Sequence, residues 1–255
     1  MITEGEKLGF LSAIERAKNE QLSEGFSVYA EGLIHKSVKL YIEPDSAKHE
    51  VDLGHAVVDI LNGDGAFEVQ TGSPLPLIDK IKRLLKDYKV TLVLPYRTAT
   101  RHLWLDTESG EIIEPERKTE QKKGIISVSE RLYAVRELIG MAGFSVRVIG
   151  IFASETRRLD GYGKEKKIRA TLIERAPLSI FSDELFVKPS DYRRLLPSGL
   201  PEKFTARELL KLAKSRSRYD RLLIKLLLHL GVIASLGKQG RAELYTVVDL
   251  NDNGV

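Results

Sequence analysis

Asp59 and Glu68 are the two residues whose types and spacing most strongly suggest catalysis. They flank the short turn of residues 62–65, Asn-Gly-Asp-Gly, and a two-residue turn there predicts a hairpin in which Asp59 lies opposite Glu68. Two carboxylates in that position repel each other, and apolar neighbours such as Ile60 and Phe67 predict strands that are at least half-buried. A divalent cation held between hard oxygen ligands offsets such repulsion. We therefore expect a catalytic metal site on this hairpin.

Other interpretations of the acidic residues remain open. Asp59 and Glu68 could also lie on a solvated face of a sheet. Glu50 and Asp52 have a similar spacing on the preceding strand. Nothing pairs these two with a second acidic residue, so they rank below Asp59.

The elements expected around the hairpin alternate between helices and strands. Periodicity and turn signals predict helices, then three strands, a helix and a buried strand. Further along, we expect a second hairpin, a polar linker, a helix that starts at Ser127 or Ser129, and another strand. The expected helices cover residues 5–20, 26–42 and 77–88; the strands cover 49–53, 56–61, 66–71, 90–95, 101–105, 110–113 and 144–152.

This order resembles the core of the PD-(D/E)XK nuclease superfamily. In this sequence the family's helix glutamate matches Glu31, its strand-two aspartate matches Asp59, and its Glu-x-Lys motif matches Glu68-Val69-Gln70. The resemblance covers roughly residues 26–95. It implies a restriction-endonuclease-like mixed α/β sheet and an Mg²⁺ or Mn²⁺ cofactor. The metal would be held by Asp59, Glu68 and the Val69 carbonyl, with Glu31 at a second metal or an outer-shell water.

The sequence departs from the family pattern at two positions. Val58 replaces the motif's proline, which costs little. Gln70 replaces the lysine that helps to orient or polarise the attacking water, and a neutral amide stabilises developing negative charge less well. A lysine of the following helix could substitute; Lys80 and Lys82 are the candidates, and we favour Lys82. Loss of activity is the alternative.

The last part of the chain predicts a second, smaller domain. Thr205 and Glu208 form a capping box, and helices are expected over 205–214 and 219–230. A β-hairpin with a basic, glycine-rich tip should follow, from strands at 232–236 and 242–248. This outline is that of a winged helix-turn-helix. We place a nuclease-like domain at residues 1–198 and the winged helix at 199–255.

The distribution of charge indicates a polyanionic partner. Net charge is +4 overall, but residues 1–100 carry 12 Lys/Arg against 15 Asp/Glu, whereas residues 201–250 carry 10 against 5. DNA is the expected partner. A solvated loop over residues 157–169, and a winged helix used for protein contact, remain alternatives. The expected DNA-contacting residues are Arg157, Arg158, Lys164, Lys166, Lys167, Arg216, Arg218, Arg221, Lys238 and Arg241.

Composition excludes several other classes of function. The chain has 255 residues, 42% of them hydrophobic, and no cysteine, which excludes disulfides and thiolate zinc sites and indicates a reducing compartment. We see no secretory signal, and the most apolar run, residues 222–233, is too short and too charged to span a bilayer. We therefore expect a cytoplasmic protein without a membrane partner. A homodimer or a protein partner is possible. The sequence has no nucleophile-elbow motif, no P-loop, no Rossmann glycine motif, and no histidines at the spacing of zinc ligands.

Two hypotheses for the function follow. The first is a metal-dependent DNA endonuclease with catalytic residues Glu31, Asp59, Glu68, Gln70 and Lys82. The second is a catalytically inactive DNA-binding or regulatory protein built on a nuclease fold, which the glutamine at position 70 favours.

Overall fold

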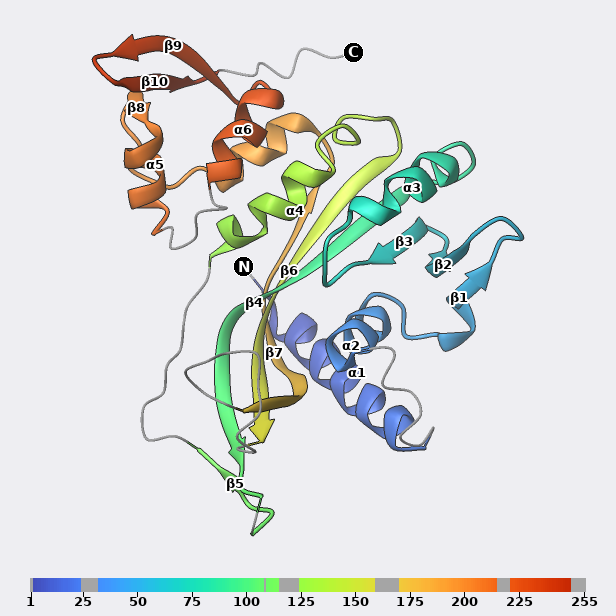
Figure 1. The fold of residues 1–255 in the computed structure, drawn as a ribbon. Helices are drawn as coiled ribbons and strands as arrows, with labels where there is room; N and C mark the ends of the chain where they lie inside the picture. Colours follow the sequence, from blue (N-terminus) through green and yellow to red (C-terminus); the bar gives the residue numbers. More distant parts are fainter. Residues whose placement is uncertain are drawn as a thin grey trace. The chain divides into compact units, whose positions relative to one another are not determined.

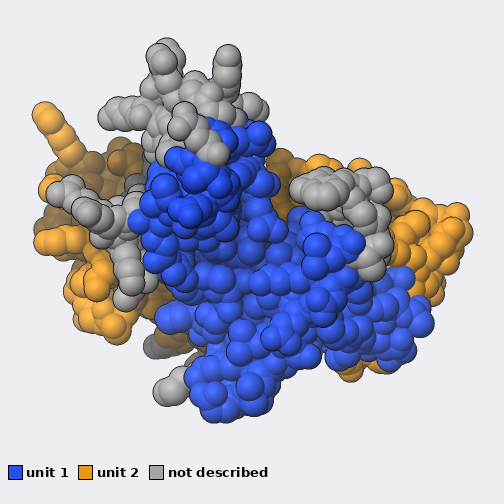
Figure 2. Space-filling view, turned by 90° about the horizontal axis from the view of Figure 1, so that it is seen from below, with its two compact units in different colours: residues 1–49, 97–123, 149–183 blue, residues 50–96, 124–148, 184–255 orange. Residues whose placement is uncertain are grey.

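The chain folds as a mixed α/β protein in which a large mixed sheet is flanked by helices (Figure 1). The structure, a computed structural model, describes residues 2–23, 32–107, 109–114, 124–158, 170–214 and 221–248. Two compact units are distinguished in Figure 2: unit 1 comprises residues 1–49, 97–123 and 149–183, and unit 2 comprises residues 50–96, 124–148 and 184–255. The proposed division into domains 1–198 and 199–255 stays a prediction, and its boundary falls inside unit 2.

The hairpin with the two acidic residues is formed by β2 (Val57–Asn62) and β3 (Gly65–Val69), next to β1 (His49–Asp52). The predicted register is confirmed, because Asn62 pairs with Gly65, Leu61 with Ala66, and Ile60 with Phe67. A short turn and α3 (Ile78–Leu84) then lead to β4 (Val90–Leu105), which runs parallel to β3. The helix is shorter than the expected 77–88.

Three strands are much longer than the sequence pattern predicts. β4 continues through the strand expected at 101–105, β6 (Phe144–Arg158) passes beyond 152, and β7 (Thr171–Phe186) has no counterpart among the expected strands. The sheet order is β1-β2-β3-β4-β6-β7, with the short β5 (Ile112–Ile113) paired to β4. β4 continues through polar residues because their side chains form hydrogen bonds with neighbouring strands. The Thr98 hydroxyl, for example, donates to the Ile151 carbonyl at 3.2 Å.

Unit 1 has a small core between two neighbouring helices, α1 (Glu4–Ser23) and α2 (Leu33–Ile42). Phe10 and Tyr41 meet edge to face, with ring centroids 5.3 Å apart. Ala176 of β7 packs into the same cluster. The first part of the expected helix at 26–42, residues 24–31, lies outside the described residues.

Unit 2 has the larger core, which includes Leu92, Leu94, Leu132 and Phe186. The helix expected from Ser129 is short: α4 (Ser129–Ala134) has only six residues. The C-terminal elements are β8 (Lys203–Thr205), α5 (Ala206–Leu212), α6 (Leu222–His229), β9 (Ile233–Gln239) and β10 (Ala242–Val247).

The small C-terminal sheet has the order β8-β10-β9, and both pairings are antiparallel. The predicted capping box is confirmed: Thr205 N donates to Glu208 Oε2 at 2.7 Å, and Glu208 N donates to Thr205 Oγ1 at 3.3 Å. Among the described residues, no helix combines the length and hydrophobicity that crossing a membrane requires.

Candidate active site at the β2–β3 hairpin

Asp59 is fixed in place by the neighbouring strand. Its Oδ2 accepts a hydrogen bond of 2.7 Å from the backbone N–H of Val69, and its side chain is half-buried. The paired register ends at Ile60 and Phe67, and Asp59 and Glu68 are the next residues on the two strands. A backbone donor to a carboxylate restrains its orientation.

Glu68 is the unusual group of the site. Only 2% of the residue is exposed, and Lys80 Nζ lies 2.5 Å from its Oε1. This contact is an ion pair without the directed geometry of a hydrogen bond. Burial, reinforced by the charge of Asp59, raises the pKa of Glu68 to about 7, although Lys80 pulls in the opposite direction. Glu68 can therefore exchange a proton near neutral pH.

The lysine that reaches the hairpin is Lys80. Lys82, the residue that the sequence favours, has an exposed side chain on α3 and is not the lysine at Glu68. Lys80 lies four residues before the fully buried Leu84, one turn along the same side of the helix. The expected cationic substitute from the next helix is thus Lys80, and its role in catalysis stays a prediction.

Gln70 uses its side chain locally. Its Oε1 accepts from Gly72 N at 3.2 Å, which closes the turn after β3. The backbone of Gln70 is bonded on both sides: its N–H donates to the Val93 carbonyl at 2.9 Å, and its carbonyl accepts from Arg131.

Arg131 is a cation at this end of the strands that sequence reasoning missed. One of its terminal nitrogens donates to the carbonyls of Gln70, at 3.2 Å, and Pro95, at 2.9 Å. Burial lowers the pKa of Arg131 to about 10, so the group stays charged at neutral pH. No local pattern signals it, because the contacts span 61 and 36 residues of sequence.

The donor set fits a hard divalent cation. Carboxylate and carbonyl oxygens are the ligands that Mg²⁺ prefers, and Asp59, Glu68 and Val69 bring such oxygens to one end of the hairpin. Within the described residues no group of three or more His, Asp or Glu side chains gathers to hold a metal. Glu31, the third expected carboxylate, lies outside the described residues. Metal and Lys80 would compete for Glu68.

The predicted DNA-contacting residues fall into three groups. Arg221, Lys238 and Arg241 are exposed in the C-terminal part, and Arg158 is exposed at the end of β6. Arg157 forms an ion pair of 3.3 Å with Glu155. Outside the described residues lie Lys164, Lys166, Lys167, Arg216 and Arg218.

Comparison with known proteins gives a family without an assigned function. A family described as "Domain of unknown function (DUF8091)" matches residues 32–187. An uncharacterized protein of Treponema pallidum (strain Nichols) is 24% identical over 221 residues, which is 86% of this chain and 86% of that protein. No solved structure matches.

Proposed function

We propose that this chain, which belongs to the family of the DUF8091 domain, is a metal-dependent DNA endonuclease that cuts phosphodiester bonds at the β2–β3 hairpin. One observation carries the proposal: two carboxylates, Asp59 and Glu68, lie on adjacent strands of a largely buried hairpin, and a lysine from α3 contacts Glu68. The order α2, β1, β2, β3, α3, β4 resembles the order expected for a PD-(D/E)XK core and supports the proposal.

Each residue of the site has a separate task in this proposal. Asp59, oriented by the Val69 N–H, and Glu68 would hold the metal together with the Val69 carbonyl. A bound Mg²⁺ or Mn²⁺ would supply a water of lowered pKa and a positive charge for the leaving oxygen. Lys80 brings a positive charge to the place where the phosphate gains negative charge, a task that the neutral Gln70 cannot perform.

The C-terminal elements support DNA as the substrate. The order β8, α5, α6, β9, β10, with β10 between the other two strands, resembles a winged helix-turn-helix and supports the proposal. Arg221 at the start of α6 and Lys238 and Arg241 at the β9–β10 tip are exposed cations. Exposed cations at these positions suit contacts to phosphates.

The test is plasmid cleavage. Supercoiled plasmid is incubated with the full chain and Mn²⁺ or Mg²⁺, and the same assay is run on Asp59→Asn and Glu68→Gln. We expect nicking or linearisation by the wild type and its loss in both variants. Glu50→Gln, an exposed carboxylate of β1, should cut like the wild type. Cutting that survives in both site variants refutes the proposal.

A second candidate function rests on the Lys80–Glu68 ion pair. With Glu68 already neutralised by Lys80 and Gln70 engaged with Gly72, the chain could be a DNA-binding or regulatory protein that has lost activity. Calorimetric titration with Mg²⁺ or Mn²⁺ separates the two functions. Heat of binding that disappears in Asp59→Asn favours the nuclease, whereas no binding at millimolar metal favours the inactive protein.

A further inference from the structure

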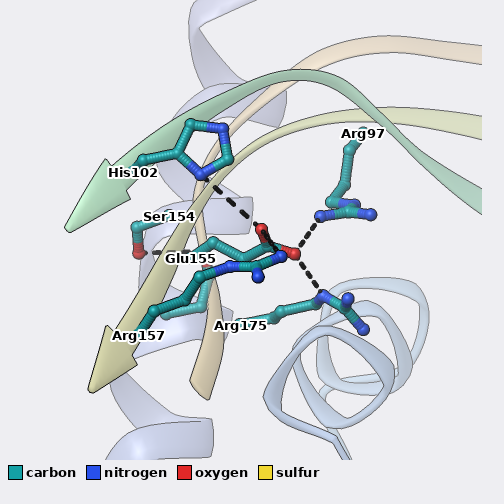
Figure 3. A network of polar contacts seen from close by, with 7 residues as sticks. Arg97, His102, Ser154, Glu155, Arg157 and Arg175 are labelled. Atoms are coloured by element: carbon teal, nitrogen blue, oxygen red, sulfur yellow. Dashed lines mark hydrogen bonds and ion pairs between the residues drawn. The ribbon is translucent and has the colours of Figure 1, made fainter. Parts of the chain in front are cut away.

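Glu155 in unit 1 organises a second polar cluster, which the hairpin does not use. Figure 3 shows side chains from three strands converging on its carboxylate: Arg97 and His102 from β4, Arg157 from β6 and Arg175 from β7. Arg97 lies 2.8 Å and Arg175 lies 2.7 Å from Oε1, whereas Arg157 lies 3.3 Å and His102 lies 3.6 Å from Oε2.

Glu155 stays ionised and holds the arginines in place. Only 4% of the residue is exposed. Burial raises the pKa of this carboxyl, but the hydrogen bond from Arg175 and the charge of Arg97 outweigh that effect, and the pKa falls to about 2. The guanidinium groups are thus oriented by a fixed negative charge, and orienting them in advance lowers the entropy lost when a ligand binds.

The cluster carries more positive charge than Glu155 can balance. Arg97 and Arg175 alone, against the one carboxylate, leave a net charge of +1. Arg97 gives one terminal nitrogen to Glu155, and Arg175 gives its Nε. The other nitrogens of these two groups make no hydrogen bond to the described part of the chain. Both side chains reach solvent, with 32% and 46% of their surface exposed.

We propose that Arg97 and Arg175, positioned by Glu155, form a binding site for a phosphate group. Guanidinium groups present planar, paired donors that match the oxygens of a phosphate, and they keep their charge at any physiological pH. A network that served only to join the three strands would not need guanidinium nitrogens that are exposed and make no hydrogen bond to the described part of the chain, as at Arg97 and Arg175. The site goes beyond the proposed nuclease and does not depend on cleavage.

The experiment measures phosphate binding by the full chain with two probes. Inorganic phosphate is titrated by calorimetry, and a fluorescent single-stranded DNA about 20 nucleotides long, enough to span a typical single-strand binding site, is titrated by anisotropy in EDTA, so that no cleavage occurs. We expect Arg97→Gln and Arg175→Gln each to weaken binding about tenfold or more, since each removes a charge-assisted contact. Arg175→Lys keeps the charge but loses the planar fork, and should bind with intermediate affinity.

The matched control is Arg16→Gln, which removes the same charge from α1 of the same unit, where the Arg16 side chain is 42% exposed. Its affinities should equal those of the wild type. Should a β-strand variant fail to fold, the wild type still provides the test, because bound phosphate should protect Arg97 and Arg175 from modification by phenylglyoxal in a mass-spectrometric footprint.

The two probes identify the source of the phosphate. Tight DNA binding with displacement only by millimolar phosphate indicates a nucleic-acid backbone, and tight binding of phosphate alone indicates a small phosphorylated ligand. The proposal is overturned if the wild type binds neither probe, or if both glutamine variants bind both probes as tightly as the wild type. Loss of cleavage in the hairpin variants leaves this inference untouched, because binding is measured without metal.

Discussion

At the scale of single residues, the hairpin differs from the expected motif in where its positive charge originates. In the family that the sequence resembles, the lysine lies on the same strand as the glutamate; here Gln70 occupies that position and Lys80 approaches from α3. The ion pair of Lys80 with Glu68 places an ammonium group beside the Glu68 carboxylate. A cation is therefore present despite the glutamine.

Replacing each of the two lysines of α3 in turn tests this assignment. We expect Lys80→Ala to lower the rate of DNA cleavage by two or more orders of magnitude, in the range of losing one electrostatic stabiliser of the transition state. Lys82→Ala is the matched control, because Lys82 lies on the same helix with an exposed side chain. Measured rates that change equally in both variants, or in Lys82→Ala alone, contradict the role of Lys80.

The raised pKa of Glu68 predicts how stability depends on pH. The pKa is 4.5 in the unfolded chain and about 7 in the folded chain, so the folded state binds the proton more tightly. The free energy of unfolding should then fall as pH rises from about 4.5 to about 7, by about 3 kcal/mol from this group.

Denaturant unfolding of Glu68→Gln between about pH 4.5 and pH 8 measures that contribution. The difference between wild type and variant should change by about 3 kcal/mol over this range, with the variant relatively more stable at high pH. Glu50→Gln, an exposed site, should keep the wild-type profile. A pH-independent difference between wild type and Glu68→Gln contradicts a raised pKa.

At the scale of elements, the geometry of the site depends on the tight end of the hairpin. Gly65 has a φ of +128°, and a Cβ atom at this position would collide with the backbone carbonyl of Lys89. That carbonyl also accepts the N–H of Ala66 at 2.9 Å, which starts the pairing of β3 with β4. The Lys89 carbonyl thus both limits the size of the residue at position 65 and begins the pairing of β3 with β4.

Gly65→Ala should consequently destabilise the protein by about 1–3 kcal/mol, through backbone strain and displacement of Lys89. Thermal unfolding measures the change. Gly63→Ala is the control, because a Cβ atom at Gly63 would meet nothing within 4 Å. Equal unfolding temperatures for the two alanine variants contradict this account of the turn.

The same elements show which features the sequence could predict. The register of β2 with β3 follows from local turn chemistry, and three of the four predicted pairs are confirmed. The predicted core face of α3, formed by Leu77, Ile81 and Leu85, is confirmed: Ile81 is buried, and the two leucines are partly buried against the same core, which Leu84 joins. The lysine at Glu68 is nevertheless Lys80 and not Lys82.

Long-range partners explain what the sequence could not predict. Arg97 interrupts the apolar run of β4, and periodicity alone would end the strand there. In the structure, its guanidinium group donates a hydrogen bond to Glu155 of β6, 58 residues further along the chain. The strand therefore continues to Leu105. Arg131 likewise has no local signal, since its partners belong to distant segments of the chain. Polar residues that are satisfied by distant strands cannot be distinguished from loop residues by periodicity alone.

At the scale of the whole molecule, each unit has its own charged cluster. Unit 2 has the acidic hairpin with Lys80, and unit 1 has the arginines around Glu155. The C-terminal elements add exposed cations at Arg221, Lys238 and Arg241. A protein that binds a polyanion at several places should show a strong dependence of affinity on salt, because each neutralised phosphate releases counterions.

The C-terminal cations predict the size of that dependence for duplex DNA. Together with Arg216 and Arg218, the three exposed residues would neutralise about five phosphates, so this module should contribute roughly −4 to −5 to the log–log salt slope. Arg221→Ala, Lys238→Ala and Arg241→Ala should each flatten the slope by about one unit and weaken binding to all sequences alike. Lys82→Ala should leave the slope unchanged.

Anisotropy titrations at several salt concentrations measure the slope for each variant. If all three variants keep the wild-type slope, the C-terminal elements contact protein rather than DNA. The basic segment 157–169 then becomes the better DNA-binding candidate.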